Sequence, residues 1–232
     1  MRIAVLLAAS LLVAGCGADS GSRPGATRLT PITPSHSANQ TTSQSSTSAT
    51  TSSPAGATAP GSTAGAGEAI AWVEAGPPVD AAGFHVALRA GTTTELGDDV
   101  AFTTPSGISC MTDVKRAASG LACLVDLADP PPQPPDVYGV WKGGWVDFDA
   151  AGVRVGSAHA DPGRFAAGRG APLPAGGSLS FGDFRCRADS ETLICVNYAR
   201  QTAVRYADSG IQAFGCTRQS PPAAGVGIQY GC

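Results

Sequence analysis

The sequence predicts a mainly β protein: a small, disulfide-stapled antiparallel sandwich or barrel with one short N-terminal helix, preceded by a disordered stalk. Three observations support this fold class. Apolar and polar residues alternate with a period of two in many segments after residue 66. Six cysteines fall in that same part of the chain. Before it lies a long stretch that is almost entirely Ser, Thr, Ala, Gly and Pro.

Residues 1–15 have the features of a secretory signal peptide. A charged start is followed by an apolar run, Ile3 to Val13, that is too short to span a bilayer as a permanent helix. The run ends on Val13-Ala14-Gly15-Cys16, which resembles a bacterial lipobox. We therefore expect cleavage before Cys16, its acylation with fatty acids such as palmitate, and anchoring at the extracytoplasmic face of the cell membrane. An incidental cysteine after a cleaved signal, or an uncleaved anchor, is the alternative.

Residues 16–66 are expected to form a disordered linker that begins at the lipidated cysteine. Their composition cannot bury enough apolar surface to offset the entropy lost on ordering. About fifty residues of flexible chain have a root-mean-square reach of roughly 40 Å. Residues 67–232 are long enough for a single extracytoplasmic domain with its own core.

One helix and several strands are predicted within that domain. The helix covers Glu68–Ala75, where good helix formers are followed by Gly76-Pro77-Pro78. Candidate strands, bounded by turn residues, are 84–88, 99–103, 121–127, 145–149 and 153–155. The proline run 129–135 ends the third of these and is expected to be an extended crossing.

The strands 145–149 and 153–155 are predicted to form a hairpin. Val146 and Phe148 share one of its faces by alternation, which suits a core. On the other face Arg154 is expected to meet Asp147 or Asp149 as an exposed pair of small energetic value.

The six cysteines predict three disulfides, because an even count in an exported domain is typical of an oxidising compartment. They are Cys110, Cys123, Cys186, Cys195, Cys216 and Cys232. The stretches 110–123 and 186–195 echo each other as strand, polar turn and strand. A short hairpin brings its two cysteines within bridging distance, which favours Cys110–Cys123 and Cys186–Cys195 and leaves Cys216–Cys232. Pairing across the two hairpins is the alternative.

Several strings resemble a secreted, cysteine-containing actinobacterial domain of unknown function that includes mycobacterial lipoproteins. They are Phe102 to Cys110, Leu173-Pro174-Ala175-Gly176 and Phe181 to Cys186, within a match over about 102–214. Two departures stand out: no cysteine pair lies between Cys123 and Cys186, and Arg200 to Ala203 replaces a histidine-containing motif. The resemblance implies a disulfide-bonded lipoprotein of the cell envelope and brings no established activity.

The aromatic residues Tyr138, Trp141 and Trp145 form one concentration in the sequence. If exposed, they could line a groove for a lipid or glycan, or bind a protein partner. If buried, they belong to the core beside the proline run, which is the interpretation we favour.

Two other patterns resemble catalytic or metal-binding motifs. Ser157, His159 and Asp161 alternate along one strand, yet residues two apart lie about 6.6 Å from each other, too far for a nucleophile and its base. A hydrolase using His159 is therefore the least favoured function. The run 147–152 resembles the start of a calcium loop but lacks an acidic or amide residue at the fifth position and a carboxylate at the twelfth, so the full ligand set is missing and turn chemistry explains it better.

Composition narrows the function classes further. The formal net charge is −3 and no cluster of Lys and Arg occurs, which argues against nucleic acid or an anionic membrane surface as partner. No phosphate-binding glycine loop and no cofactor motif occurs, and no metal site is expected. We expect a non-enzymatic binding or protein-interaction module, held at the membrane through the lipid on Cys16 and meeting an envelope protein, a lipid or a glycan.

Overall fold

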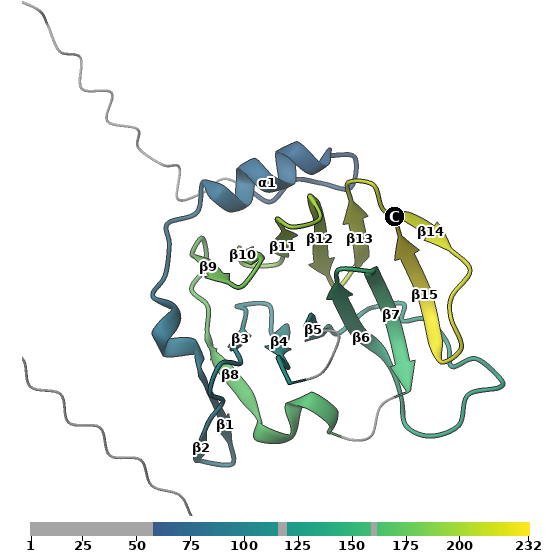
Figure 1. Ribbon diagram of the computed structural model, residues 1–232, viewed down its shortest axis with the longest axis horizontal. Coiled ribbons are helices and arrows are strands. Elements are labelled where there is room, and N and C mark those ends of the chain that lie inside the picture. The colour runs from purple at the N-terminus through teal and green to yellow at the C-terminus, as the bar shows by residue number, and fades with distance from the viewer. Residues whose placement is uncertain (1–57, 116–119, 159–161) are drawn as a thin grey trace, which may run out of the picture. The chain divides into compact units, whose positions relative to one another are not determined.

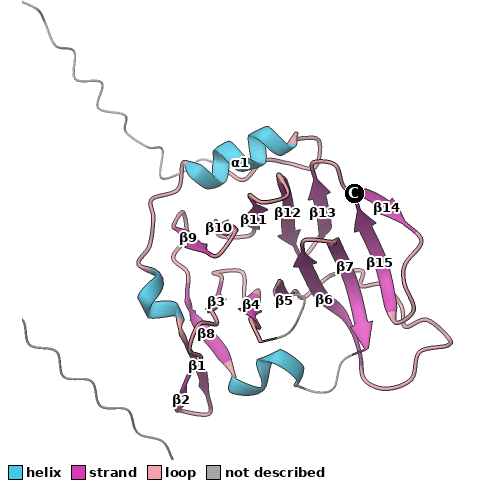
Figure 2. Cartoon of the chain, in the orientation of Figure 1, coloured by secondary structure: helices cyan, strands magenta, loops and turns pink. Residues whose placement is uncertain are grey.

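Two β-sheets make up the architecture of the computed structural model, which describes residues 58–115, 120–158 and 162–232 (Figures 1 and 2). The larger sheet has ten strands in the order β14 (Arg218–Ser220), β15 (Val226–Gly231), β7 (Gly152–Ala158), β6 (Trp141–Asp149), β5 (Leu121–Leu124), β4 (Ser109–Thr112), β3 (Ala101–Thr103), β8 (Arg169–Pro172), β1 (Val86–Arg89) and β2 (Thr92–Glu95). The smaller sheet has five, in the order β13 (Gly210–Phe214), β12 (Thr202–Ala207), β11 (Leu193–Asn197), β10 (Phe184–Ala188) and β9 (Ser178–Phe181).

Strand pairing is antiparallel apart from β3 with β8. Neither sheet closes on itself, so the mainly β fold class is confirmed in its sandwich form and not as a barrel. The main core cluster draws side chains from both sheets, among them Phe102 and Phe148 from the larger and Leu193 and Tyr206 from the smaller. The two sheets therefore bury their inner faces against each other, which is the usual origin of a sandwich core.

The helix α1 (Ala66–Glu74) covers the outer face of the smaller sheet. Ala69, Trp72 and Val73 are buried, which is the spacing of one helical face. The Glu68 carboxylate accepts a hydrogen bond from the Gly65 backbone N–H at 2.8 Å and so caps the first turn. The predicted helix is confirmed, shifted by two residues at its start.

Two arginines of β10 hold the carboxyl end of α1. Arg187 donates from Nη1 to the Trp72 carbonyl at 2.6 Å, and its guanidinium lies 4.3 Å from the Trp72 ring centroid. Arg185 donates from Nη2 to the Gly76 carbonyl at 3.1 Å. Positive groups at this end of a helix offset its partial negative charge, so the two side chains hold α1 on the sheet. Burial lowers the pKa of Arg187, and the nearby Asp189 carboxylate acts in the opposite direction.

Short 3₁₀ turns account for the remaining helical segments. In η1 (Ala81–Phe84), Phe84 enters the main core, so the expected strand 84–88 begins only at Val86. The turn η2 (Gly163–Ala167) lies on the outer face of the larger sheet, where the Phe165 ring meets Trp145 edge-on with centroids 5.4 Å apart. The expected strands 99–103 and 121–127 are also shorter than predicted, because loops replace their ends.

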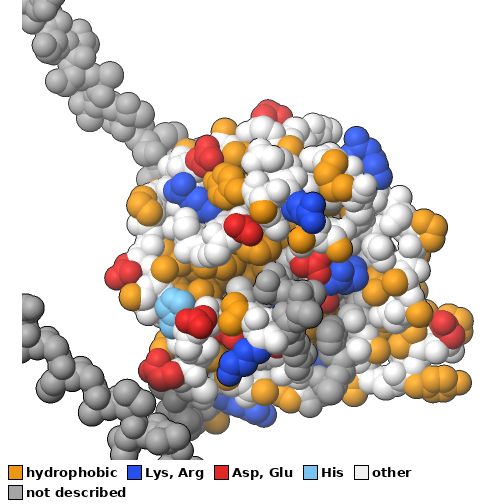
Figure 3. Space-filling model, viewed as in Figure 1, with side chains coloured by type: hydrophobic (Ala, Val, Ile, Leu, Met, Phe, Trp, Pro, Cys, Tyr) orange, Lys and Arg blue, Asp and Glu red, His pale blue; other side chains and the backbone are white. Residues whose placement is uncertain are grey.

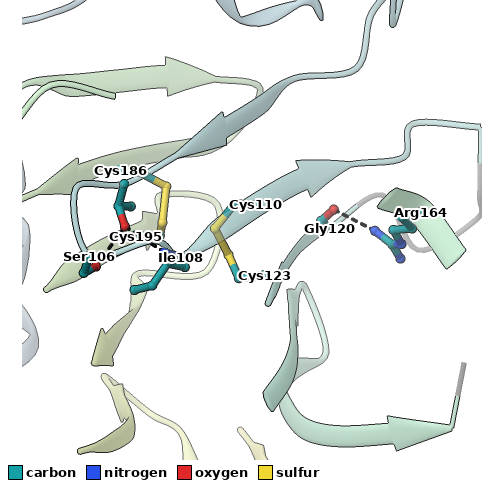
Figure 4. Close-up of a disulfide and its surroundings, with 9 residues drawn as sticks. Ser106, Ile108, Cys110, Gly120, Cys123, Arg164, Cys186 and Cys195 are labelled. Atoms are coloured by element: carbon teal, nitrogen blue, oxygen red, sulfur yellow. Dashed lines mark hydrogen bonds between the residues drawn. A yellow bond between two sulfur atoms is a disulfide. The ribbon is translucent and has the colours of Figure 1, made fainter. Parts of the chain in front are cut away.

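Three disulfides are formed, Cys110–Cys123, Cys186–Cys195 and Cys216–Cys232, as predicted. The first two each join cross-strand partners of one hairpin, β4 with β5 and β10 with β11. All four of these cysteines are fully buried in the main core cluster. Figure 4 shows both disulfides, each within its own sheet. The echoed sequences therefore place one disulfide on the inner face of each sheet.

Candidate functional site

The connection between β5 and β6, residues 125–140, projects beyond the ends of β7 and β15 (Figure 1). We call its outer part, residues 130–140, the proline loop. Pro131 is the one residue of the proline loop that is buried, and it is held at the loop's base by glycines of neighbouring strands. A Cβ added to Gly227 would lie 2.7 Å from Pro131 Cβ, and one added to Gly156 would lie 2.9 Å from Pro131 Cγ. The pyrrolidine ring therefore occupies space that only glycines leave open.

Hydrogen bonds fix the base and the tip of the proline loop. Trp141 donates from Nε1 to the Pro131 carbonyl at 2.9 Å. Nearer the tip, the Val137 N–H donates to the Pro134 carbonyl at 3.1 Å, which closes a β-turn. The Gln133 side-chain amide donates to the Val137 carbonyl at 2.6 Å. Together with the fixed φ of its prolines, these bonds restrict the conformations open to the loop.

The tip of the proline loop presents apolar side chains to solvent. Tyr138 is 90% exposed and Val140 is 53% exposed, two of the four large hydrophobic side chains that are exposed in the described residues. Pro132, Pro135 and Asp136 are exposed as well. Side chains coloured as hydrophobic gather at the corresponding corner of the molecule in Figure 3. An exposed aromatic residue on a fixed loop is the kind of surface that protein partners bind.

The three aromatic residues singled out in the sequence do not form one exposed patch. Trp145 is fully buried between the larger sheet and η2, Trp141 is partly buried at the base of the proline loop, and only Tyr138 is fully exposed. A groove lined by all three residues is therefore ruled out, because Trp145 is buried. The physical reason is η2, because this turn, from a later part of the chain, covers the face of β6 on which Trp145 lies. The favoured interpretation, core beside the proline run, is correct for Trp145, holds in part for Trp141 and is wrong for Tyr138.

The expected exposed ion pair is also corrected. Arg154 meets Asp149 through Nη2 and Oδ2 at 2.6 Å, but the Asp149 side chain is only 7% exposed. Arg164 of η2 approaches Asp147 at 3.8 Å and donates to the Gly120 carbonyl at 3.1 Å (Figure 4). Both carboxylates thus face arginines. Within the described ranges, no group of three or more His, Cys, Asp or Glu side chains is arranged to hold a metal ion.

Two predicted sites lie outside the described residues. His159 and Asp161 fall in the gap 159–161, and Cys16 falls in 1–57. The hydrolase hypothesis and the lipid anchor therefore remain predictions from the sequence.

The glycines that enclose the base of the proline loop were not predicted from the sequence. Gly143, Gly156 and Gly227 lie in strands, where glycine weakens a sheet. Such glycines signal a close approach by another segment, but only the fold shows that the segment is Pro131. The exposed position of Tyr138 had a weaker signal, since it lies only three residues after the last proline of the run, Pro135.

No protein family, curated protein or solved structure matches this chain. Among the helices in the described part of the chain, none has the length and hydrophobicity required to cross a bilayer. The three disulfides are typical of an oxidising, extracytoplasmic compartment.

Proposed function

We propose that this protein is an exported lipoprotein, acylated on Cys16 at the outer face of the cell membrane, and that its β domain binds another envelope protein through the proline loop. The observation that carries the binding role is the 90% exposed Tyr138 on a loop with a buried, glycine-enclosed base. The role is one of binding, and it requires no catalytic group.

Preorganisation supports this choice of surface. A loop that is already fixed loses little conformational entropy when a partner binds, so more of the contact energy appears as affinity. Tyrosine is enriched among residues that contribute most to protein interfaces. The apolar neighbours Val140 and Pro135 would surround it, and Asp136 would add one charge at the rim.

The sequence supports the anchor. The charged start, the short apolar run and the small residues before Cys16 form the lipobox-like pattern, and two or three acyl chains give stable attachment. The disulfides agree with export. Metabolic labelling with a radioactive or clickable fatty acid tests this part directly: the native chain should be labelled, and Cys16→Ala should be unlabelled and released from membranes. Labelling that persists in Cys16→Ala would refute acylation at this residue.

The binding role is tested by photo-cross-linking on living cells. A photoreactive phenylalanine analogue at position 138 should give a covalent adduct with one discrete envelope protein. The matched control places the same analogue at position 114, where Val114 is also an exposed apolar residue, at 46%. An adduct seen at 138 and missing at 114 supports the proposal, and equal or absent adducts at both positions refute it.

A further inference from the structure

A cleft of about 620 Å³ opens on the outer face of the larger sheet and shares no residue with the proline loop. Strands β1, β4, β5 and β8 and the turn η2 supply its lining. Leu124 and Phe165 form part of an apolar wall. The charged and polar side chains of the lining include Arg89, Arg169, Ser109 and Asp126. This volume is within the range of small-molecule sites, which combine apolar walls with a few polar groups.

Two arginines give the cleft a positive side. Arg89 donates from Nη1 to the Ala166 carbonyl at 2.9 Å, and Arg169 donates from Nη2 to the Gly107 carbonyl at 2.9 Å. Each guanidinium has five N–H donors, so most of them remain available after these bonds. Within the described residues neither arginine forms an ion pair. The carbonyls therefore orient the two side chains without neutralising their charge.

Ser109 also lines the cleft, but its hydroxyl is buried beneath the wall. The residue is only 6% exposed, and its Oγ has almost no exposed surface and no hydrogen-bond partner among the described residues. A ligand in the cleft does not reach this oxygen. The charged donors open to a ligand are therefore those of Arg89 and Arg169.

The charges in the cleft select the kind of anion. Arg89 and Arg169 contribute two positive charges and the exposed Asp126 contributes one negative charge, which leaves one positive charge in excess. A monoanion balances this charge, whereas a phosphate dianion would leave one negative charge uncompensated. The apolar wall of Leu124 and Phe165 favours a ligand with a hydrocarbon part.

We propose that this cleft binds a single-chain amphiphile with one carboxylate. The carboxylate accepts hydrogen bonds from the two guanidinium groups, and the hydrocarbon part packs along Leu124 and Phe165. Arginine suits this role because its planar donors match the two oxygens of a carboxylate. The site is distinct from the proline loop, so either proposal can fail alone.

Calorimetric titration of the oxidised full chain with sodium decanoate tests the site. The chain carries Cys16→Ala, so that no acyl group of its own competes. We expect one site, with affinity weakened about tenfold or more by Arg169→Gln or Arg89→Gln, since a charge-assisted hydrogen bond is lost. Arg200→Gln is the matched control, because Arg200 is an exposed arginine that does not line the cleft.

Neutral and inorganic probes complete the test. Decanol should bind at least tenfold more weakly than decanoate, and inorganic phosphate should show no saturable binding at the same concentrations. Equal affinity for decanol, tighter binding of phosphate, or an Arg200→Gln effect as large as that of Arg169→Gln would each overturn the proposal. No heat from decanoate at millimolar concentration would overturn it too, provided that each variant keeps the thermal midpoint of the parent chain.

Discussion

The hairpins β4–β5 and β10–β11 carry the same local pattern but are covered in different ways. Each points a disulfide into the shared core. The residue after the first cysteine points outward in both, and it is Met111 in one hairpin and Arg187 in the other. Met111 lies among Ala122, Trp145 and Phe165, whereas Arg187 lies under α1 against Trp72. The outward residue therefore matches the segment that covers it. Met111 is apolar like the turn η2 above it, and Arg187 donates to a carbonyl near the end of α1, where backbone carbonyls lack partners within the helix.

The strands that follow each hairpin extend this difference. Leu124, just after Cys123, pairs with Trp145, and Val196, just after Cys195, pairs with Ala203. The small Ala203 leaves room for a helix, and the large Trp145 fills the space under a single 3₁₀ turn. The outer face beside one hairpin is thus covered by a helix, and the outer face beside the other is filled by one large side chain under a short turn.

The largest effect is expected when the large side chain is removed. Trp145→Ala should lower the free energy of unfolding by about 3–5 kcal/mol, because it deletes a fully buried ring and leaves a cavity under η2. Urea titration at neutral pH measures this loss. Trp145→Phe is the control, since it keeps a ring near Phe165 and should cost less. A loss below about 1.5 kcal/mol for Trp145→Ala would show that η2 collapses onto the sheet unaided.

Removing either hairpin disulfide should cost about 3 kcal/mol, on the chain-entropy model for loops of this size. The two bonds close similar loops, with sequence separations of 13 and 9. Cys110→Ala with Cys123→Ala, and Cys186→Ala with Cys195→Ala, should therefore be equally destabilised in urea. A difference above about 1.5 kcal/mol would mean that the outer cover, and not the loop closure, sets the value of the bond.

Exchanging the outward residue tests the comparison itself. Arg187→Ala should cost about 2–4 kcal/mol, because a fully buried side chain and its bond to the Trp72 carbonyl are lost. Arg187→Met, the residue found in the other hairpin, should cost less than about 1.5 kcal/mol, since it fills most of the space and buries no charge. Chemical unfolding of both variants decides this. If Met is as costly as Ala, the guanidinium and not the packing holds α1.

The smallest change in stability is expected at an inward-facing position of the strand that follows each hairpin. Leu121 pairs with Phe148, and the equivalent Leu193 pairs with Tyr206, whose hydroxyl is buried without a hydrogen-bond partner among the described residues. Tyr206→Phe makes the two positions alike and should change stability by less than about 1 kcal/mol at neutral pH, with a gain favoured.

The effect of Tyr206→Phe on stability should be larger at alkaline pH. Burial, and to a smaller extent the Asp147 charge, raise the pKa of Tyr206 far above its usual range. The folded state keeps the proton that the unfolded chain releases above a pH of about 10, so this contribution is fully present below pH 10 and is lost as pH rises beyond it, by about 1.4 kcal/mol per pH unit. Unfolding midpoints measured from pH 9 to 11.5 should fall less steeply in Tyr206→Phe. Parallel curves would contradict the raised pKa.

The sequence predicted what depends on local pattern. The disulfide pairs follow from two short hairpins, α1 from its composition and stop signal, and the inward positions of Val146 and Phe148 from alternation. The burial of Trp145 agrees with the favoured interpretation of the aromatic group as core, but the covering turn η2 was not predicted. Nor was the burial of Asp149 predicted, because alternation indicates a second face but not whether a distant segment covers it. The base of the proline loop was missed for the same reason, since Pro131 and Gly227 meet only after β15 pairs with β7.

The base and the tip of the proline loop differ in what they contribute to folding. Pro131, Trp141 and the glycines around them pack together at the base, so the fold depends on them and they tolerate little change. Positions 135–139 are largely free of this constraint, because four of these five residues are exposed and the bonds of Val137 to Gln133 and Pro134 use only its backbone. The tip can therefore be rewritten, by natural divergence or by inserting a recognition peptide, while the sandwich beneath it stays intact, as in other scaffolds whose loops carry the variable function.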